Sequence, residues 1–464
     1  MLTDADTIAA VATPPGVAAV AIVRISGPAA FAVATACFEP ARAGPWHAQQ
    51  MRRGWVRAPG DGDRIDDALG VRFPSPHSYT GEDVVELHVH GGAGVVAAVL
   101  AQVLASGARL AQPGEFTRRA FVNGRMDLAQ AEAVADLINA ESRLAAKAAA
   151  GRLEGAVGKA VREVRSEMLA RLVEIEAHVD YPDEVEMPSS DAIGAFVRSA
   201  RARVGRLLIG AGSAKALRDG IDCVIAGPPN AGKSSLLNAL LATERAIVSD
   251  VPGTTRDVIE DRVAVDGVVL RLRDTAGLRR TRDAIEAEGV ERARAAVARA
   301  ELVLLVLDGS RPLGDDERAA IELTDGSARI VLCNKADLGD EGTRALRASR
   351  PDLVAESADS AFVAGSVRDP ACIEALRTRI ARLGWGGGAV DANAALVANA
   401  REIEAIVRAG EALDHAAATI DARLPIDLLT GDLRTAIAAL GEVTGETVTD
   451  EVLDGIFSRF CVGK

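Results

Sequence analysis

The chain has 464 residues, of which 48% are hydrophobic and 26% are charged, and its formal net charge is −13. Because this length exceeds what one hydrophobic core usually supports, we expect two or three domains of ordinary globular composition. The negative charge excludes binding of nucleic acid by overall attraction, so any RNA contact must use a local basic patch.

The sequence also disfavours membrane insertion and secretion. No apolar run reaches the length of about 18 residues that a membrane span needs, and Asp4 and Asp6 lie where a signal peptide would be basic. We therefore expect a cytoplasmic protein with no membrane partner. The cysteines are dispersed, odd in number and without a C-x-x-C pair, which indicates reduced thiols. They are Cys37, Cys223, Cys333, Cys372 and Cys461.

Residues 1–122 are predicted to form an α+β domain. Short apolar runs occur at 17–25 and 83–89 and alternate with turn clusters that are rich in proline and glycine. This alternation is typical of short strands joined by tight turns. The turn clusters lie at 13–16, 74–76 and 91–92.

Residues 123–217 are predicted to be the first part of a helical domain. From Asp127 the sequence is rich in alanine, and apolar residues recur at helical spacing. Tyr181-Pro182-Asp183 interrupts this pattern, and a second helix is predicted from Asp191 to Ser213. Its apolar stripe consists of Ile193, Phe196, Val197, Ala200, Val204 and Leu207.

A nucleotide-binding pattern opens the next zone, residues 218–383. Residues 227–234 read G-x-x-x-x-G-K-S, with a predicted strand before them and a predicted helix from Ser235 after them. Small residues let backbone N–H groups point at phosphates, Lys233 adds a positive charge, and the Ser234 hydroxyl can bind Mg²⁺. The helix N-terminus also favours an anion. We therefore expect this chain to bind a nucleoside triphosphate.

Two further motifs favour GTP over ATP. Asn334-Lys335-Ala336-Asp337 follows the apolar run 328–333, and its carboxylate can accept hydrogen bonds from two guanine N–H groups that adenine lacks. A site built around such an acceptor penalises adenine. Asp274-Thr275-Ala276-Gly277 follows a predicted strand at 268–273 and would place a carboxylate near Mg²⁺ and an N–H near the γ-phosphate. In this order the motifs resemble the Ras-like GTPase domain of the translation-factor-related branch.

The catalytic group of this domain is not the usual one. In many GTPases a glutamine after D-T-A-G orients the attacking water, whereas Leu278 stands there in this chain. The carbonyl oxygen of Asn230 suits a monovalent cation that would replace an arginine finger, and the alternative is a local Asx turn. Residues 249–257 hold two adjacent threonines after a glycine. One hydroxyl can meet Mg²⁺ while neighbouring carbonyls close over a second ion.

Residues 384–464 complete the chain. The segment 384–388 reads G-W-G-G-G and is a flexible linker by composition, and a helical pattern runs from Asn393 to the end. The simplest architecture therefore inserts the GTPase domain into one helical domain, and two separate bundles remain an alternative. The expected fold is multidomain: an α+β N-terminal domain, an α-helical bundle domain and an inserted α/β P-loop Ras-like GTPase domain.

Several motifs outside the GTPase zone are more specific. They are Phe460-Cys461-Val462-Gly463-Lys464, the segment 4–27, Tyr79-Thr80-Gly81-Glu82-Asp83, Pro113-Gly114-Glu115-Phe116-Thr117 and the segment 127–132. With them the whole chain resembles the bacterial tRNA-modification GTPase family MnmE (TrmE). The resemblance implies an N-terminal domain that binds folate and dimerises, a discontinuous helical domain and a potassium-dependent GTPase domain.

The resemblance also implies partners and a reaction. The family works with the FAD-containing protein MnmG, in a heterotetramer, on certain tRNAs. It places an aminomethyl or carboxymethylaminomethyl group on C5 of the wobble uridine, and formyl- or methylene-tetrahydrofolate is the implied one-carbon donor. GTP is then the substrate of hydrolysis, with potassium and magnesium ions as cofactors.

Individual roles follow from the same resemblance. The potassium site matches Asn230, Ser249, Val251 and Thr254, and the magnesium ligands match Ser234 and Thr255. Glu286 matches the glutamate that orients the hydrolytic water, and Cys461 matches the thiol of the modification site. The folate-binding positions are Arg24, Glu86, Arg125 and Lys464. The expected GTP-binding residues are Asn230, Ala231, Gly232, Lys233, Ser234, Ser235, Ser249, Asp250, Val251, Pro252, Gly253, Thr254, Thr255, Asp274, Thr275, Ala276, Gly277, Asn334, Lys335, Asp337, Ser366, Val367 and Arg368.

Other interpretations stay open at this point. From the residues alone, Glu286 is one of several acids at the start of a helix, and the alternative for Cys461 is a small buried apolar side chain. A regulatory GTPase switch, such as a ribosome-assembly factor, predicts an RNA-binding appendage with a basic face, and the terminal parts of this chain are acidic to neutral. A P-loop kinase or ATPase is disfavoured by the guanine motif that ends in Asp337.

Overall fold

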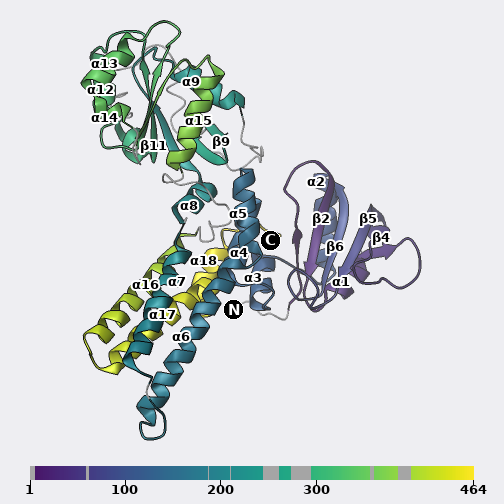
Figure 1. Ribbon diagram of the computed structural model, residues 1–464. Coiled ribbons are helices and arrows are strands. Elements are labelled where there is room, and N and C mark those ends of the chain that lie inside the picture. Colours follow the sequence, from purple (N-terminus) through teal and green to yellow (C-terminus); the bar gives the residue numbers. More distant parts are fainter. Residues whose placement is uncertain are drawn as a thin grey trace. The chain divides into compact units, whose positions relative to one another are not determined.

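The computed structural model describes residues 6–58, 62–186, 188–209, 211–243, 261–272, 294–355, 360–384 and 399–464. The chain forms two compact units, and each is built from separated stretches of sequence (Figure 1). Unit 1 contains Met1–Ala135, Leu153–Val197 and Glu411–Lys464, and unit 2 contains Asp136–Arg152 and Arg198–Gly410. Within the described ranges, every helix is too short or too polar to span a lipid bilayer.

The N-terminal part of unit 1 is a seven-stranded sheet with the order β3-β4-β5-β6-β2-β1-β7. Neighbouring strands are antiparallel except β1 and β7, which are parallel. Helices α1 (Ala30–Cys37) and α2 (Ala93–Ala105) contact each other and the sheet. The strands are β1 (Ile8–Val11), β2 (Ala18–Ser26), β3 (Phe38–Pro40), β4 (Arg52–Arg57), β5 (Arg64–Phe73), β6 (Val84–Gly91) and β7 (Arg109–Leu110). The predicted runs 17–25 and 83–89 are β2 and β6, so the α+β prediction is confirmed.

The helical part of unit 1 contains α3 (Glu115–Val122), α6 (Ala156–Asp180), α17 (Ile426–Thr444) and α18 (Asp450–Phe457), together with most of α4 (Leu128–Ile138). Helices α6 and α17 run side by side (Figure 1). The apolar stripe of α6 is buried at helical spacing, so packing rather than propensity stabilises this long helix. Its buried residues include Val157, Val161, Val164, Met168, Leu172 and Ile175.

One predicted helix boundary is wrong. The helix expected to run to Ser213 is α7 (Ser190–Leu207), and a separate helix α8 (Ala211–Asp219) follows it. The end of α7 is a turn in which the N–H groups of Leu208 and Ile209 donate to carbonyls three positions earlier. Such tight hydrogen bonds commonly close a helix terminus.

The GTPase zone lies in unit 2 as a six-stranded sheet with the order β13-β12-β11-β8-β10-β9. All neighbouring strands are parallel except β9 and β10. Alternate strand residues face α9 and α15 on one side of the sheet and α12, α13 and α14 on the other. This arrangement confirms the predicted α/β class. The strands are β8 (Ile221–Ala226), β9 (Asp261–Val265), β10 (Val268–Leu272), β11 (Leu302–Asp308), β12 (Arg329–Asn334) and β13 (Ser360–Ala364).

The helices of this sheet are α9 (Lys233–Thr243), α12 (Asp315–Leu323), α13 (Glu341–Ser349), α14 (Pro351–Val354) and α15 (Pro370–Gly384). Helix α9 begins two residues before the predicted Ser235, because the N–H of Leu236 already bonds to the carbonyl of Gly232. The phosphate loop therefore passes into the helix without an intervening turn.

Unit 2 also contains helix α5 (Arg143–Leu153) up to Arg152, and the first part of α16 (Ala400–Asp421). Arg152 and Glu402 form a salt bridge of 2.8 Å in which the two side chains are 2% and 0% exposed. At the other end of α5, the Ser142 hydroxyl donates a 2.8 Å hydrogen bond to the carbonyl of Gly267, in the β9–β10 turn. Polar contacts therefore join α5 to α16 near one end and to the β9–β10 turn of the sheet near the other.

Candidate functional site

The phosphate loop connects β8 to α9 at the carboxyl edge of the six-stranded sheet. Gly227 has φ +141°, and a Cβ there would lie 2.1 Å from the carbonyl oxygen of Val306. Gly232 has φ +105°, and a Cβ there would lie 2.2 Å from the Asn334 side chain. Both glycines are required, because any side chain would push the loop away from the neighbouring strands.

The Lys233 side chain lies within the loop that its motif predicts. Its Nζ donates hydrogen bonds of 2.7 Å to the carbonyls of Gly227 and Pro228. Burial lowers the pKa of this ammonium. A phosphate group at the loop would supply the negative charge that these neutral carbonyls lack.

Asn334 joins the phosphate loop to the second loop of the predicted guanine site. Its Nδ2 donates to the carbonyl of Ala231 at 2.9 Å, and its Oδ1 accepts from the N–H of Val367 at 3.0 Å. The side chain is 2% exposed. Asp337 and Arg368 are exposed at the same edge, and Ser366 is buried. The structure thus places the described residues that are predicted to bind GTP at one edge of the sheet.

Most of the remaining GTP and metal assignments lie outside the described residues. These are Ser249, Asp250, Val251, Pro252, Gly253, Thr254, Thr255, Asp274, Thr275, Ala276, Gly277 and Glu286. Of the expected potassium ligands, only Asn230 is described. It is exposed and adopts a left-handed backbone conformation with φ 60°, which asparagine tolerates better than most residues. Ser234 and Ser235 are exposed in the first turn of α9.

A second cluster of site residues lies in unit 1. Arg24 on β2 is paired with Glu86 on β6, and Nε of the arginine lies 2.9 Å from Oε1 of the glutamate. The Arg24 guanidinium lies 5.3 Å from the ring centre of Tyr79 and 5.7 Å from that of Phe116. Both rings are within cation–π distance, so this charge is held between aromatic side chains.

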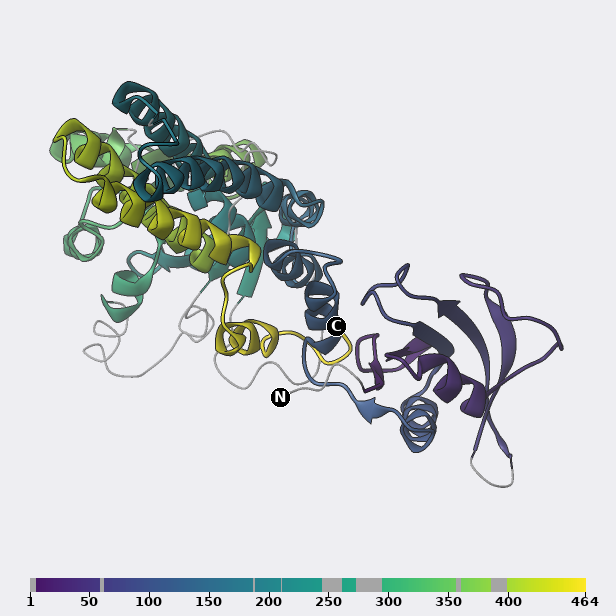
Figure 2. The same cartoon turned by 90° about the horizontal axis from the view of Figure 1, so that it is seen from below.

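The C-terminal segment reaches this cluster (Figure 2). Val462 forms an antiparallel bridge with Pro113, and the N–H of Gly114 donates to the carbonyl of Cys461 at 3.3 Å. Gly463 has φ +97°, and a Cβ there would lie 2.1 Å from the carbonyl oxygen of Val11. The segment is therefore packed so closely against β1 that only glycine fits.

Lys464 completes the cluster. Burial lowers the pKa of its ammonium, and Arg24 acts in the same direction, whereas Glu86 and Cys461 oppose the shift. The lysine thus lies within electrostatic reach of both members of the Arg24–Glu86 pair. Arg125 is exposed and lies beside Gly81, whose added Cβ would be 3.1 Å from Cγ of the arginine.

Cys461 differs from the other four cysteines. Burial raises the pKa of the Cys37 thiol to about 12 and that of Cys333 to about 11, and Cys223 and Cys372 are also buried. Cys461 is exposed, so the interpretation that it is a buried apolar side chain is wrong. Solvent access is what a reacting thiol requires.

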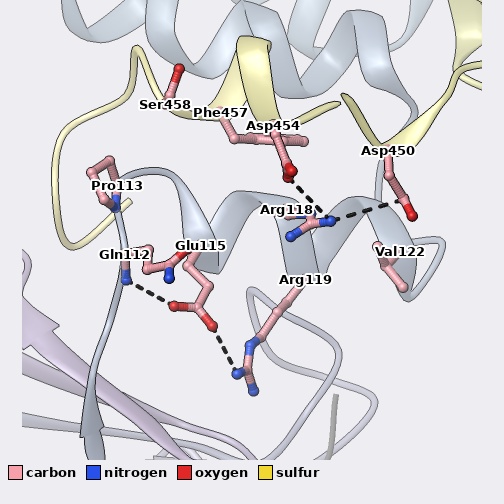
Figure 3. Close-up of a pocket in the computed structure, with 10 residues that line it drawn as sticks. All are labelled: Gln112, Pro113, Glu115, Arg118, Arg119, Val122, Asp450, Asp454, Phe457 and Ser458. Atoms are coloured by element: carbon pink, nitrogen blue, oxygen red, sulfur yellow. Dashed lines mark hydrogen bonds and ion pairs between the residues drawn. The ribbon is translucent and has the colours of Figure 1, made fainter. Parts of the chain in front are cut away.

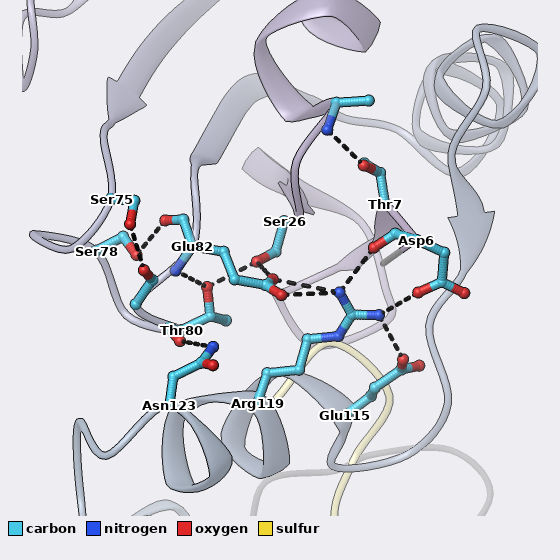
Figure 4. Close-up of polar contacts among 12 residues, drawn as sticks. Asp6, Thr7, Ser26, Ser75, Ser78, Thr80, Glu82, Glu115, Arg119 and Asn123 are labelled. Carbon is cyan, nitrogen blue, oxygen red and sulfur yellow. Dashed lines mark hydrogen bonds and ion pairs between the residues drawn. The ribbon is translucent and has the colours of Figure 1, made fainter. Parts of the chain in front are cut away.

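A largely buried ion-pair network connects α3 to Asp6 before β1, to Glu82 before β6 and, through Glu82, to Ser26 at the end of β2 (Figure 4). The Arg119 guanidinium donates to Oδ1 of Asp6 at 2.6 Å, to Oε1 of Glu115 at 3.0 Å and to Oε1 of Glu82 at 3.2 Å. The Ser26 hydroxyl donates to Glu82 at 2.7 Å. Arg119 and Glu115 are only 6% and 3% exposed, so the charges neutralise each other away from water.

A pocket of about 710 Å³ lies between α3 and α18 (Figure 3). Arg118 points toward the α18 carboxylates, with Nη2 at 3.4 Å from Asp454 and 4.0 Å from Asp450. The same helix, α18, precedes the C-terminal segment. The pocket is lined by Gln112, Pro113, Glu115, Arg118, Arg119, Val122, Asp450, Asp454, Phe457 and Ser458.

Three residues that contribute to these sites were not predicted from the sequence. Tyr79 and Arg119 stand in or next to motifs that carried the family resemblance, but no local pattern assigns them a partner. Asp308 accepts a 2.7 Å hydrogen bond from Nζ of Lys335 in the guanine motif. It did offer a signal, because it ends an apolar strand that is followed by glycine, and ligands bind at the carboxyl ends of parallel strands.

The chain matches two family models. One is described as the MnmE helical domain and matches residues 128–461, and the other is described as the GTP-binding protein TrmE N-terminus and matches residues 7–125. A solved structure, the translation elongation factor SelB of Methanococcus maripaludis bound to a GTP analogue, has 15% identity and a TM-score of 0.28, covering 37% of this chain and 35% of that one.

Similar proteins extend along the full length. The tRNA modification GTPase MnmE of Symbiobacterium thermophilum is 47% identical over 465 residues, which cover 99% of both chains. The protein of the same name from Chloroflexus aurantiacus is 45% identical over 460 residues, which cover 99% of this chain and 100% of that protein. With this identity over its whole length, the chain belongs to the tRNA modification GTPase MnmE family.

Proposed function

We propose that this protein hydrolyses GTP in a potassium-dependent manner and uses a folate one-carbon unit to modify tRNA. The product is the aminomethyl or carboxymethylaminomethyl group at C5 of the wobble uridine, made together with an FAD-containing partner of the MnmG type. The observation that carries this proposal is the position of Cys461 and Lys464 beside the Arg24–Glu86 pair, in a chain that also holds the phosphate loop.

The folate cluster has the chemistry that the proposed substrate needs. Reduced folates present N–H donors on the pterin ring and carboxylates on the glutamate tail. Glu86 can accept hydrogen bonds from the ring, and Arg24, Arg125 and Lys464 can pair with carboxylates. The exposed thiol of Cys461 would lie next to the bound one-carbon unit.

Potassium and magnesium belong to the nucleotide site in this proposal. Asn230, with Ser249, Val251 and Thr254, would hold potassium through hard oxygen donors. Ser234 and Thr255 would bind magnesium. A bound cation would supply positive charge near the phosphates, and Glu286 would orient the water in place of the absent glutamine.

The proposal also includes the assembly and its domains. The N-terminal domain (1–122) would form a homodimer, and two MnmG-type chains would complete a heterotetramer that acts on tRNA. The helical domain would consist of 123–217 and 384–464, with the GTPase domain (218–383) inserted.

Nucleoside mass spectrometry tests the function as a whole. A strain that lacks this chain should lose the C5 substituents of the wobble uridine, and re-expression of the chain should restore them. Unchanged nucleosides in the deletion strain would refute the proposed reaction, even if the purified protein hydrolyses GTP.

A further inference from the structure

Asp308 lies at the edge of the sheet where the nucleotide site is built, but it belongs to none of the motifs. It is the last residue of β11 and is paired in register with Asn334, the last residue of β12. The side chain is only 3% exposed. A carboxylate buried at this edge needs hydrogen-bond donors or positive charges as partners. The identity of these partners indicates the role of the carboxylate.

Three side chains surround the carboxylate. Oδ1 accepts from the Ser310 hydroxyl at 2.6 Å, and Oδ2 accepts from Arg311 at 2.9 Å and from Nζ of Lys335 at 2.7 Å. Burial raises the pKa of Asp308, but these hydrogen bonds outweigh it and hold the pKa well below its ordinary value. Asp308 is therefore a permanent anion at neutral pH.

Lys335 is the partner that connects Asp308 to the nucleotide site. It stands between Asn334 and Asp337 in the guanine motif, and its backbone adopts a left-handed conformation with φ 66°. Such a conformation is strained for a non-glycine residue and persists only where the surrounding contacts hold it. The lysine starts after β12 and ends at Asp308 on β11, so its stem crosses from one strand end to the next.

Lys233 and Lys335 have different hydrogen-bond partners. Lys233 is the cation of the phosphate loop, and its Nζ contacts that loop. Lys335 has its charge satisfied by Asp308 instead, and its side chain is 25% exposed. What Lys335 offers a ligand at this edge is therefore mainly its apolar stem, which suits a flat base or a ribose.

We infer that Asp308 is a positioning residue for nucleotide binding, which holds Lys335 across the sheet edge so that the lysine stem forms a wall of the site for the base and ribose. The inference rests on the proposed GTP site. Base and ribose are common to GTP and GDP, so both nucleotides should depend on Asp308 equally, whereas a group that contacts the γ-phosphate would distinguish them.

A double-mutant cycle tests this inference. Asp308→Asn and Lys335→Met should each weaken the affinity for GDP and for a non-hydrolysable GTP analogue by about 10-fold, which is about 1.4 kcal/mol. The double variant should be no weaker than Lys335→Met, because Asp308 acts through the lysine. KM for GTP should rise while kcat stays unchanged. Titration calorimetry on the full chain measures the affinities.

Two variants serve as matched controls. Arg311→Ala removes another partner of the Asp308 carboxylate, and the Arg311 side chain is 69% exposed. Asp325→Asn removes a different carboxylate, which pairs with Arg329 and Arg350. Both should bind nucleotides like the wild type. Thermal unfolding checks that each variant is folded. If Asp308→Asn does not fold, Lys335→Met alone provides the test.

The outcomes separate this inference from the proposed function. Wild-type affinity in both Asp308→Asn and Lys335→Met would overturn it, as would fully additive losses in the double variant. A wild-type chain that binds neither guanine nucleotide would instead refute the proposed GTP site.

Discussion

The N–H of Phe116, in the first turn of α3, donates a hydrogen bond of 3.2 Å to the carbonyl oxygen of Lys464. The last residue of the chain is thereby anchored on the N-terminal domain, next to Arg24 and Glu86. Phe457 and Phe460 support this anchor from α18 and the residues after it, with ring centres 5.4 Å apart. The C-terminal segment and the N-terminal sheet thus contribute to one cluster within unit 1.

Removal of Cys461 to Lys464 should therefore separate two activities. We expect weaker binding of reduced folate and loss of wobble-uridine modification, because the deletion removes the Lys464 charge and the Cys461 thiol together. GTP hydrolysis should persist, since the phosphate loop and Asn334 lie in unit 2. Calorimetric folate titration, GTPase rates and nucleoside analysis measure the three quantities. Equal folate affinity in the truncated chain would contradict the shared site.

The substitution Cys461→Ser tests whether the thiol takes part in the modification reaction. Serine keeps the size of the exposed side chain and leaves the backbone bond from Gly114 to the Cys461 carbonyl intact. Folate should still bind through the charged residues, and modification should fail. The control is Cys37→Ser, at a buried thiol that lies in the core of the N-terminal domain; its modification level per folded protein should stay normal. Normal modification by Cys461→Ser would remove the cysteine from the reaction.

Potassium dependence should reside in the amide of Asn230. If a monovalent cation replaces an arginine finger, hydrolysis should be much faster in K⁺ than in Na⁺, because an arginine finger contributes about 10³ to 10⁵ in rate. Asn230→Gly should abolish the difference while it preserves the loop, since glycine adopts φ 60° without strain. GDP affinity is the control and should not change. Equal rates in the two salts would rule out the cation.

Features formed by residues that are close together in the sequence were predicted more accurately than contacts between residues that are far apart in it. The phosphate loop is local: strand, glycines, lysine and helix follow one another within 221–243, and the predicted helix start differs from the observed one by two residues. The end of α7 was predicted at Ser213, whereas the helix ends at Leu207, where hydrogen bonds to carbonyls three positions earlier turn the backbone.

Long-range charge networks were not predictable in the same way. Asp6 and Arg119 are 113 positions apart, and each is an ordinary surface residue type until the fold pairs them. From the sequence, Asp308 could be recognised only as the end of a predicted strand. Its partner Lys335 belongs to the guanine motif, which gives no indication of a contact with Asp308. The residues expected to bind folate were assigned through resemblance alone, and Arg24, Glu86 and Lys464 lie together in the structure.

The Arg119 network should control the stability of the N-terminal domain. Arg119→Gln removes the cation that buried Glu115 shares with half-buried Glu82. Because Arg109 still pairs with Glu115, we expect a cost of about 3 kcal/mol, the lower end of the range for breaking a buried ion pair. Urea unfolding of the full chain, followed by the fluorescence of Trp46 and Trp55 on this domain, measures the loss.

The wild-type domain should also be acid-sensitive through this network. Burial raises the pKa of Glu115, but hydrogen bonds from Arg109 and Arg119 outweigh it and lower the pKa below its ordinary value of 4.5. A lowered carboxyl pKa stabilises the folded state above pH 4.5, and this contribution is lost as the pH falls through the folded-state value. Arg119→Gln should therefore show a shallower loss between pH 5 and 3. Arg53→Gln, at a pair with exposed Asp67, is the control and should change neither stability nor its pH dependence. A pH profile of Arg119→Gln parallel to that of the wild type would show that the network does not hold these carboxylates ionised.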